Sequence, residues 1–240
     1  ARRPPQGRLR RPGLMARRSC LPAPPALPPD HAGLDRLEGP EAAARLYALA
    51  GAGEEGAGLL LRRADLTGED LDGLTLAGCV LEGCRLTGAG LRRASFTDCL
   101  FRQCDLSGAQ WYDGSLLRCR WEGVKALGCN LAGACIRDLD CTGSRLDALR
   151  LDGAALEYVR FADTSLTGAN LAGLRWKHLA LEEADLSGAC VTGTRLRGLD
   201  LRLCRLTGLT AGESLRELRG AIVDPIQAAE LARLLGLEIR

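Results

Sequence analysis

The chain has 240 residues, enough for one large domain or two small ones. Its 32 basic and 30 acidic residues leave a net charge of +2, which argues against a strongly basic nucleic-acid binder and against an acidic chain. Aromatic residues make up 4% and glycines number 30, so a core here must be narrow and built mainly from Leu, Ala and Cys. No apolar stretch reaches the roughly 18 residues of a membrane span.

Residues 1–35 are rich in Arg and Pro, with seven Arg against two Asp and with runs such as Pro24-Pro25. This composition predicts a disordered arm. No apolar run of signal-peptide length follows the arginines, and the chain carries 11 Cys, so we expect a reducing, cytoplasmic location. The only Met is Met15, which makes a natural start at that residue a reasonable hypothesis.

Residues 36–58 are expected to contain a short helix from Pro40 to Leu49. Proline is favoured in the first turn of a helix, and Gly51 follows the apolar and alanine-rich run. We expect this helix to cap the N-terminal end of the segment that follows.

Residues 59–210 carry a five-residue repeat. Stepping by five from Leu61 to Leu206 gives thirty positions, all apolar and without an insertion. In a chain with 46% hydrophobic residues, chance would produce this with a probability of roughly 10⁻¹⁰, so the period must be structural. Two residues before each of these centres the side chain is mostly small, and two residues after it glycine is frequent.

A period of five fits neither an α-helix nor an ordinary strand over this length. It fits a backbone that turns a corner every five residues and points its central and small residues inward. Four sides then close a coil of about 20 residues, and about 7.5 coils stack at roughly 4.8 Å. Residues 20 apart should form inner columns, for example Leu61, Leu81, Phe101, Trp121, Cys141, Phe161, Leu181 and Leu201.

Several repeats share a signature: Ala64-Asp65-Leu66-Thr67-Gly68, Cys104-Asp105-Leu106-Ser107-Gly108, Ala169-Asn170-Leu171-Ala172-Gly173 and Ala184-Asp185-Leu186-Ser187-Gly188. They resemble the A-(D/N)-L-x-x pattern of pentapeptide-repeat proteins over about 150 residues. The resemblance implies an all-β fold, a right-handed quadrilateral β-helix, to which we add short capping helices at both ends.

Residues 211–240 are expected to form a C-terminal helix and a short strand. Asp224 suits the N-cap, Pro225 the first helical position and Gly236 the stop, while Leu237-Glu238-Ile239 alternates like a strand. The helix could plug the last coil of a monomer, but its apolar surface favours a dimer. The candidate dimer interface consists of Ile226, Leu231, Leu234, Leu235, Leu237 and Ile239.

The same ending is similar to the C-terminal module of loop-free Qnr-type and MfpA-type members of the family. Leu218-Arg219-Gly220-Ala221-Ile222, Gln227 and Leu234-Leu235-Gly236-Leu237 carry this resemblance. Those members dimerise end to end and bind DNA gyrase as mimics of duplex DNA. The resemblance therefore implies a type II topoisomerase as a partner, with quinolone resistance or self-protection as the role.

The sequence offers no constellation for catalysis, a cofactor or a metal. Eight cysteines fall on inward positions at the repeat spacing and are expected to act as small core residues, whereas Cys135 and Cys190 should face outward. His31 and His178 have no catalytic or metal-binding neighbours at a helpful spacing. We predict a non-catalytic, protein-binding chain with no direct nucleic-acid binding.

One predicted face carries an excess of basic residues. It is the face centred on Leu76 and Phe96, and its candidate partner surface consists of Arg118, Arg137, Arg175, Lys177, Arg195 and Arg197. An acidic partner could dock on this strip, although a solvated surface of mixed charge is the simpler interpretation. A DNA mimic should instead be acidic along its length. A general scaffold that uses the basic strip for a different partner is therefore the alternative to the topoisomerase hypothesis.

Overall fold

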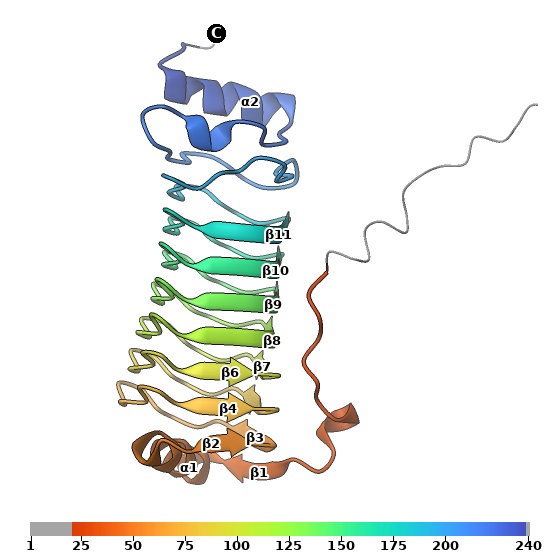
Figure 1. Ribbon diagram of the computed structural model, residues 1–240, viewed down its shortest axis with the longest axis vertical. Helices are drawn as coiled ribbons and strands as arrows, with labels where there is room; N and C mark the ends of the chain where they lie inside the picture. The colour runs from red at the N-terminus through yellow and green to blue at the C-terminus, as the bar shows by residue number, and fades with distance from the viewer. Residues whose placement is uncertain (1–20, 239–240) are drawn as a thin grey trace, which may run out of the picture.

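The computed structural model describes residues 21–238, which form a single solenoid with a helix at each end (Figure 1). An extended N-terminal segment runs along its side. The described elements, in chain order, are η2 (Pro29–His31), β1 (Asp35–Glu38), α1 (Gly39–Ala52), β2 (Glu55–Ala57), β3 (Leu59–Arg62), β4 (Thr75–Ala77), β5 (Val80–Glu82), β6 (Ser95–Thr97), β7 (Leu100–Arg102), β8 (Ser115–Glu122), β9 (Cys135–Thr142), β10 (Ala155–Ala162), β11 (Arg175–Glu182), η3 (Arg216–Leu218), α2 (Pro225–Ala232) and η4 (Arg233–Leu235).

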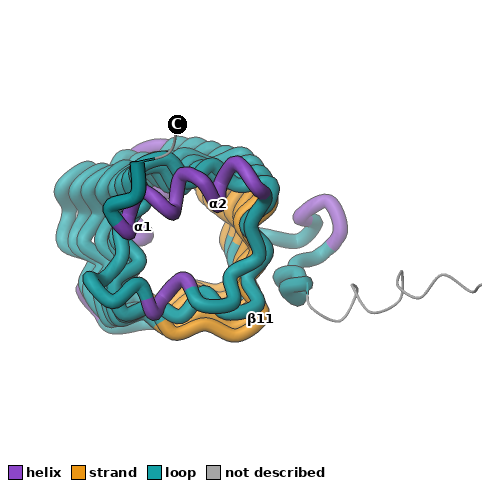
Figure 2. Tube along the Cα trace, turned by 90° about the horizontal axis from the view of Figure 1, so that it is seen from above, coloured by secondary structure: helices purple, strands orange, loops and turns teal. Residues whose placement is uncertain are grey.

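All the described strands pair in parallel, and each pairs with a strand of a neighbouring coil. Leu61 lies opposite Leu81, Leu81 opposite Phe101, and Phe101 opposite Trp121, so the register advances by 20 residues per coil. The cross-section is four-sided, with the strands concentrated on two adjacent sides and turns on the other two (Figure 2). The predicted right-handed quadrilateral β-helix is confirmed.

The interior is filled by the residues that the period of five points inward. Of the thirty central positions, 29 are buried, and the side chains two residues before them are mostly buried as well. Full burial of one such leucine stabilises the fold by roughly 1.5–3 kcal/mol. The stacked coils also satisfy the backbone polar groups, as in the Gly68 N–H, which donates to the Thr87 carbonyl at 2.9 Å.

Trp176 is the exception among the central residues, because its side chain is only half-buried. Its indole nitrogen donates to the Arg195 carbonyl at 2.7 Å. Trp111, by contrast, is fully buried beside Gly114, where an added Cβ would lie 2.4 Å from the Trp111 indole nitrogen. Three residues after Trp176 stands Leu179 in place of a glycine.

Four of the six aromatic central residues, Phe96, Phe101, Trp111 and Trp121, gather in neighbouring coils. The rings of Phe96 and Trp111 lie 4.7 Å apart, those of Phe96 and Phe101 5.2 Å apart, and those of Trp111 and Trp121 6.2 Å apart. Edge and offset contacts at these distances add to the stabilisation from burial alone.

The N-terminal end is closed by α1. Its side chains Ala42, Leu46 and Leu49 are at most 1% exposed. A Cβ on Gly56 would lie 2.6 Å from the Leu49 side chain, so glycine there lets the helix approach the first coil. The strand β1 pairs with β3, with Leu37 opposite Leu61, and this places the start of the solenoid earlier than the expected boundary at residue 59.

The C-terminal end is closed by α2. Asp224 and Gln227 form a capping box at its N-terminus. The Gln227 side chain also donates to the carbonyls of Leu201 and Cys204, each at 2.7 Å, and so fixes the helix on the last coil. That coil extends to the bridge between Asp200 and Ile222, beyond the expected boundary at residue 210.

The expected strand at residues 237–239 is not confirmed. Leu237 and Glu238 follow η4 without strand pairing, and Ile239 lies outside the described residues. A strand needs a partner edge, and in the described chain the last coil is followed by a helix at this point. No helix within residues 21–238 has the length and apolar character needed to cross a membrane.

Candidate binding surfaces

The cysteines on inward positions are buried in the core. Cys79, Cys84, Cys99, Cys104, Cys119, Cys129, Cys141 and Cys204 are all free and buried. Burial raises the pKa of the Cys129 and Cys141 thiols to about 12, so they stay protonated near neutral pH. Cys135 is exposed and Cys190 is half-buried, and hydrogen bonds from Thr192 lower the pKa of the Cys190 thiol.

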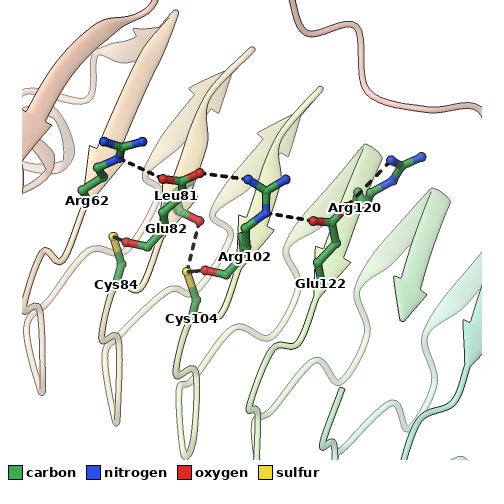
Figure 3. A network of polar contacts seen from close by, with 8 residues as sticks. All are labelled: Arg62, Leu81, Glu82, Cys84, Arg102, Cys104, Arg120 and Glu122. Carbon is green, nitrogen blue, oxygen red and sulfur yellow. Dashed lines mark hydrogen bonds and ion pairs between the residues drawn. The ribbon is translucent and has the colours of Figure 1, made fainter. Parts of the chain in front are cut away.

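On the face centred on Leu81, basic and acidic side chains alternate along the axis (Figure 3). Arg102 lies between two carboxylates, 3.0 Å from Glu82 and 2.9 Å from Glu122. The ladder consists of Arg62, Glu82, Arg102, Glu122, Arg120, Asp140, Arg160 and Glu182. Exposed pairs of this kind contribute only about 0–1 kcal/mol each, but they cancel the charge of this face.

The middle of the expected basic strip is also neutralised. Arg118 binds Asp98 through two hydrogen bonds, of 2.7 and 2.6 Å. Glu157 accepts from both Arg137 at 2.6 Å and Lys177 at 3.2 Å, and these bonds lower the pKa of its carboxyl. These basic residues of the strip are therefore already paired within the chain.

The C-terminal end of the strip differs. Arg195 and Arg197 line a shallow depression together with Arg216 and Arg219, and all four are exposed. Within the described part of the chain, none of the four makes an ion pair. We call these four residues the C-terminal basic cluster. Arg175, on the next coil, is also exposed and without an ion pair in the described chain.

Glu217 is the acidic residue of this depression. It is 9% exposed, and one of its oxygens accepts from the Gly193 N–H at 2.9 Å. This bond lowers the pKa of the Glu217 carboxyl, so its charge persists in the folded chain. Arg216 and Arg219 could not be assigned to this surface from the sequence, because they follow the last repeat and no period places them on a face.

Residues 21–35 follow a defined path along the side of the solenoid, which corrects the expectation of disorder for this part of the arm. Leu27 and Leu34 pack against an apolar cluster on the outside of the solenoid, formed by Leu60, Val80 and Leu100. These three residues stand at outward positions one coil apart. Apolar side chains at outward positions 20 residues apart are the sequence signal from which a covering segment could have been predicted. Residues 1–20, with the predicted start at Met15, lie outside the described residues.

Exposed large apolar side chains concentrate at the C-terminal end. Ile226 is 75% exposed, Leu235 66%, Leu237 56% and Leu234 38%. Leu203 and Ile222, absent from the candidate interface, are 70% and 43% exposed. Leu231, by contrast, packs against the core, which makes it a poor interface residue.

The family model described as pentapeptide repeats matches residues 58–93, 70–108 and 160–198, with 8 copies. Comparison with curated proteins gives no significant match.

Among solved structures, trypsin-treated QnrB1, a plasmid-mediated fluoroquinolone resistance protein, is 21% identical, with a TM-score of 0.35 and coverage of 86% of this chain and 98% of that chain. HetL, a pentapeptide repeat protein involved in heterocyst differentiation regulation in Nostoc sp. strain PCC 7120, is 23% identical, with a TM-score of 0.32 and coverage of 70% and 89%. A pentapeptide repeat protein of the Arabidopsis thaliana thylakoid lumen is 22% identical, with a TM-score of 0.31 and coverage of 43% and 68%.

Proposed function

Because the chain is a pentapeptide-repeat protein, we propose that it is a non-catalytic, homodimeric binding protein that acts through its exterior. Its interior is filled with side chains, so ligands and partners must be recognised on the faces and ends of the rod. Two neighbouring features support the proposal: an apolar C-terminal end and a basic cluster beside it.

The apolar end is the observation that carries the proposal. Six of the eight exposed large apolar side chains within residues 21–238 belong to the last coil and the C-terminal segment, which is the distribution expected of an interface rather than of chance exposure. One end of a rod can meet the same end of a second copy around a two-fold axis. The proposed interface therefore comprises Leu203, Ile222, Ile226, Leu234, Leu235 and Leu237.

Sedimentation velocity of the full chain tests the dimer. We expect the wild type to sediment as a dimer and Ile226→Asp/Leu235→Asp to sediment as a monomer with an unchanged circular dichroism spectrum. Tyr47→Asp is the matched control, because Tyr47 is 57% exposed at the opposite end and should leave the dimer intact. An intact dimer in the double variant would refute the interface.

The partner surface that we propose is the C-terminal basic cluster with Arg175. These arginines have no ion pairs in the described chain to give up, whereas Arg118, Arg137 and Lys177 would have to break existing ones. Desolvation and Coulomb attraction therefore favour an acidic protein surface at the C-terminal end. The alternative is a scaffold that binds a different partner through the whole basic strip. The supercoiling assay described below distinguishes the two.

A type II topoisomerase such as DNA gyrase is the partner that we propose, on the resemblance of the C-terminal segment to Qnr-type and MfpA-type members. QnrB1 itself is described as a fluoroquinolone resistance protein. The paired charges of the ladder do not reproduce the dense negative charge of a duplex, so we place the contact at the basic cluster rather than on an acidic face.

A gyrase supercoiling assay with and without quinolone tests this proposal. We expect micromolar wild-type protein to change supercoiling or protect it from the drug, and Arg195→Glu/Arg197→Glu/Arg216→Glu to lose the effect. Arg85→Glu is the control, because Arg85 is exposed and paired with Asp65 away from the cluster. No effect of the wild type would exclude gyrase and leave the scaffold function. An effect unchanged in the triple variant would exclude the cluster as the contact.

A further inference from the structure

One corner of the solenoid differs from the others in its side chains. Its left-handed positions are occupied by glycine at Gly58 and Gly78, as geometry favours, and then by Asp98, Arg118, Asp138, Tyr158 and His178 on five consecutive coils. All five have φ between 48° and 57°. No other corner in the described chain shows so long a run without glycine. We call these five residues the corner groove.

Backbone N–H groups of the N-terminal arm donate hydrogen bonds to side chains of the corner groove. Between Pro22 and Pro29 the chain has only three N–H groups, since five of these eight residues are proline. The Ala23 N–H donates to Asp138 at 2.9 Å and the Ala26 N–H to Asp98 at 2.8 Å. The third, on Leu27, donates to the Pro25 carbonyl at 3.0 Å. The carboxylates of the groove therefore accept both N–H groups that the arm does not satisfy itself.

The spacing of these two bonds matches the two periods involved. Asp98 and Asp138 stand two coils apart, which is about 9.6 Å along the axis. Ala23 and Ala26 stand three residues apart, and three residues of polyproline II helix advance about 9.3 Å. An extended proline-rich segment with an N–H at every third residue thus stays in step with every second coil.

Side chains around the groove complete a recognition surface. Arg118 lies on the coil between the two aspartates and holds Asp98 through its paired hydrogen bonds. Tyr158 and His178 stack on each other, with centroids 4.4 Å apart, and Tyr158 lines a depression with Leu21, Ala23 and Asp138. Aromatic side chains that line a groove are what proline-rich segments bind in known recognition domains.

The backbone of the groove supports a binding role. Tyr and Arg are disfavoured in the left-handed region, where glycine fits without steric cost. Backbone of this kind clusters at binding sites and ligand clamps, and in this rod single corner positions such as Arg93 and Ala148 also adopt it. A corner that served only to turn the chain would gain stability from glycine, as at Gly58 and Gly78 of the same column.

From these contacts we infer that the corner groove is a binding site for extended proline-rich peptides, and that residues 21–28 of the chain occupy it as an intramolecular ligand. The class of ligand is a segment with free N–H groups three residues apart and prolines between them, followed by an apolar residue that reaches Leu60, Val80 and Leu100. The tethered arm competes with any such segment from another protein. This inference does not depend on the dimer or on the topoisomerase.

The test uses the full chain and a fluorescein-labelled peptide of residues 21–31, followed by fluorescence anisotropy. An arm variant, Ala23→Pro/Ala26→Pro/Leu27→Asp, removes both donors and the apolar contact without changing the solenoid. A short tether gives an effective concentration in the millimolar range, so we expect the arm variant to bind the peptide at least about tenfold more tightly than the wild type.

Variants of the groove then identify the site. In the arm variant, Asp98→Ala/Asp138→Ala should weaken peptide binding by at least about tenfold. Asp163→Ala is the matched control, because Asp163 is an aspartate in a left-handed corner of another column, and it should change binding by less than about twofold. A peptide with the substitutions of the arm variant should not bind. Thermal melts monitored by circular dichroism confirm that each variant is folded.

Two results would overturn the inference. Equal peptide affinity in the wild type and the arm variant would show that the arm does not occupy the site in solution. Unchanged affinity in Asp98→Ala/Asp138→Ala would place the peptide elsewhere on the rod.

Discussion

The two ends of the solenoid are both covered by a helix, yet they expose very different surfaces. At the N-terminal end, α1 buries Leu46 and Leu49 and lies between two paired strands, β1 before it and β2 after it. At the C-terminal end, α2 is held mainly by the polar contacts of Gln227, while Ile226 and Leu235 point into solvent. A capping helix can therefore bury its apolar side chains on the end coil, as α1 does. It can also cover the end coil and expose apolar side chains of its own, as α2 does.

The residues that fill the interior also differ along the rod. The middle coils hold the aromatic cluster of Phe96, Trp111 and Trp121, with glycine at Gly114 making room for an indole. Towards the C-terminal end the centres are mostly leucine, and Trp176 turns partly outward. The following predictions test this difference between the ends, from the largest expected effect to the smallest.

The largest effect is expected at the N-terminal cap. Leu46→Asp places an unpaired charge in a fully buried site and should reduce the free energy of unfolding by at least about 4 kcal/mol. Leu235→Asp, at the exposed C-terminal end, should change the free energy of unfolding of the monomer by less than about 0.5 kcal/mol. Urea denaturation below the dimer dissociation constant compares the two. Similar losses in both variants would mean that the C-terminal cap is as well packed as the N-terminal one.

An intermediate effect is expected at Gln227. Its side-chain amide satisfies two carbonyls of the last coil, so Gln227→Ala should cost about 1–3 kcal/mol. Because these bonds fix α2, hydrogen exchange should accelerate in α2 while α1 stays protected. Asp224→Ala, which removes only the N-cap, should cost about 1 kcal/mol and is the graded control. Uniform acceleration at both ends would contradict an independently held C-terminal cap.

A smaller effect concerns pH at the N-terminal half. Hydrogen bonds from Arg118 and then from the Ala26 N–H lower the pKa of the Asp98 carboxyl below its ordinary value, against the opposing effect of burial. The stabilisation that this provides is complete above the ordinary value of about 3.9 and is lost as pH falls through the lowered pKa. We expect Arg118→Ala to raise the Asp98 pKa more than Ala26→Pro does. Carbon-13 titration of the carboxyl measures both, and an order reversed between them would contradict this account.

The smallest effect on stability is expected from thiol modification. In native protein, iodoacetamide should modify Cys135 and Cys190 among the ten described cysteines, because the other eight are buried. Melting temperature should be unaffected, since neither residue packs in the core. Peptide mass spectrometry identifies the modified sites. Rapid alkylation of Cys129 in native protein would indicate that the middle coils open, contrary to their dense packing.

The sequence by itself determined the direction of nearly every solenoid side chain. A strict period of five with one apolar and one small residue per repeat admits a single inward set, and Leu106, Phe101 and Cys141 all lie where the period places them. Local geometry repeated without a phase slip is enough for this, because each coil meets the next in the same register. The repeat also predicted two capping segments, because the end coils of a solenoid must be covered.

The contacts of the outward-facing residues, by contrast, were decided only by the tertiary structure. Ala26 and Asp98 are 72 positions apart, and Ala23 and Asp138 are 115 apart, so no periodic pattern joins them. The arm has no repeat of its own, and its place depends on an apolar patch and on carboxylates that come together only when coils stack. The neutral middle and unpaired end of the basic strip likewise arise from contacts between coils. Inward directions are fixed by the local period, whereas outward contacts depend on which distant groups the folded coils bring within reach.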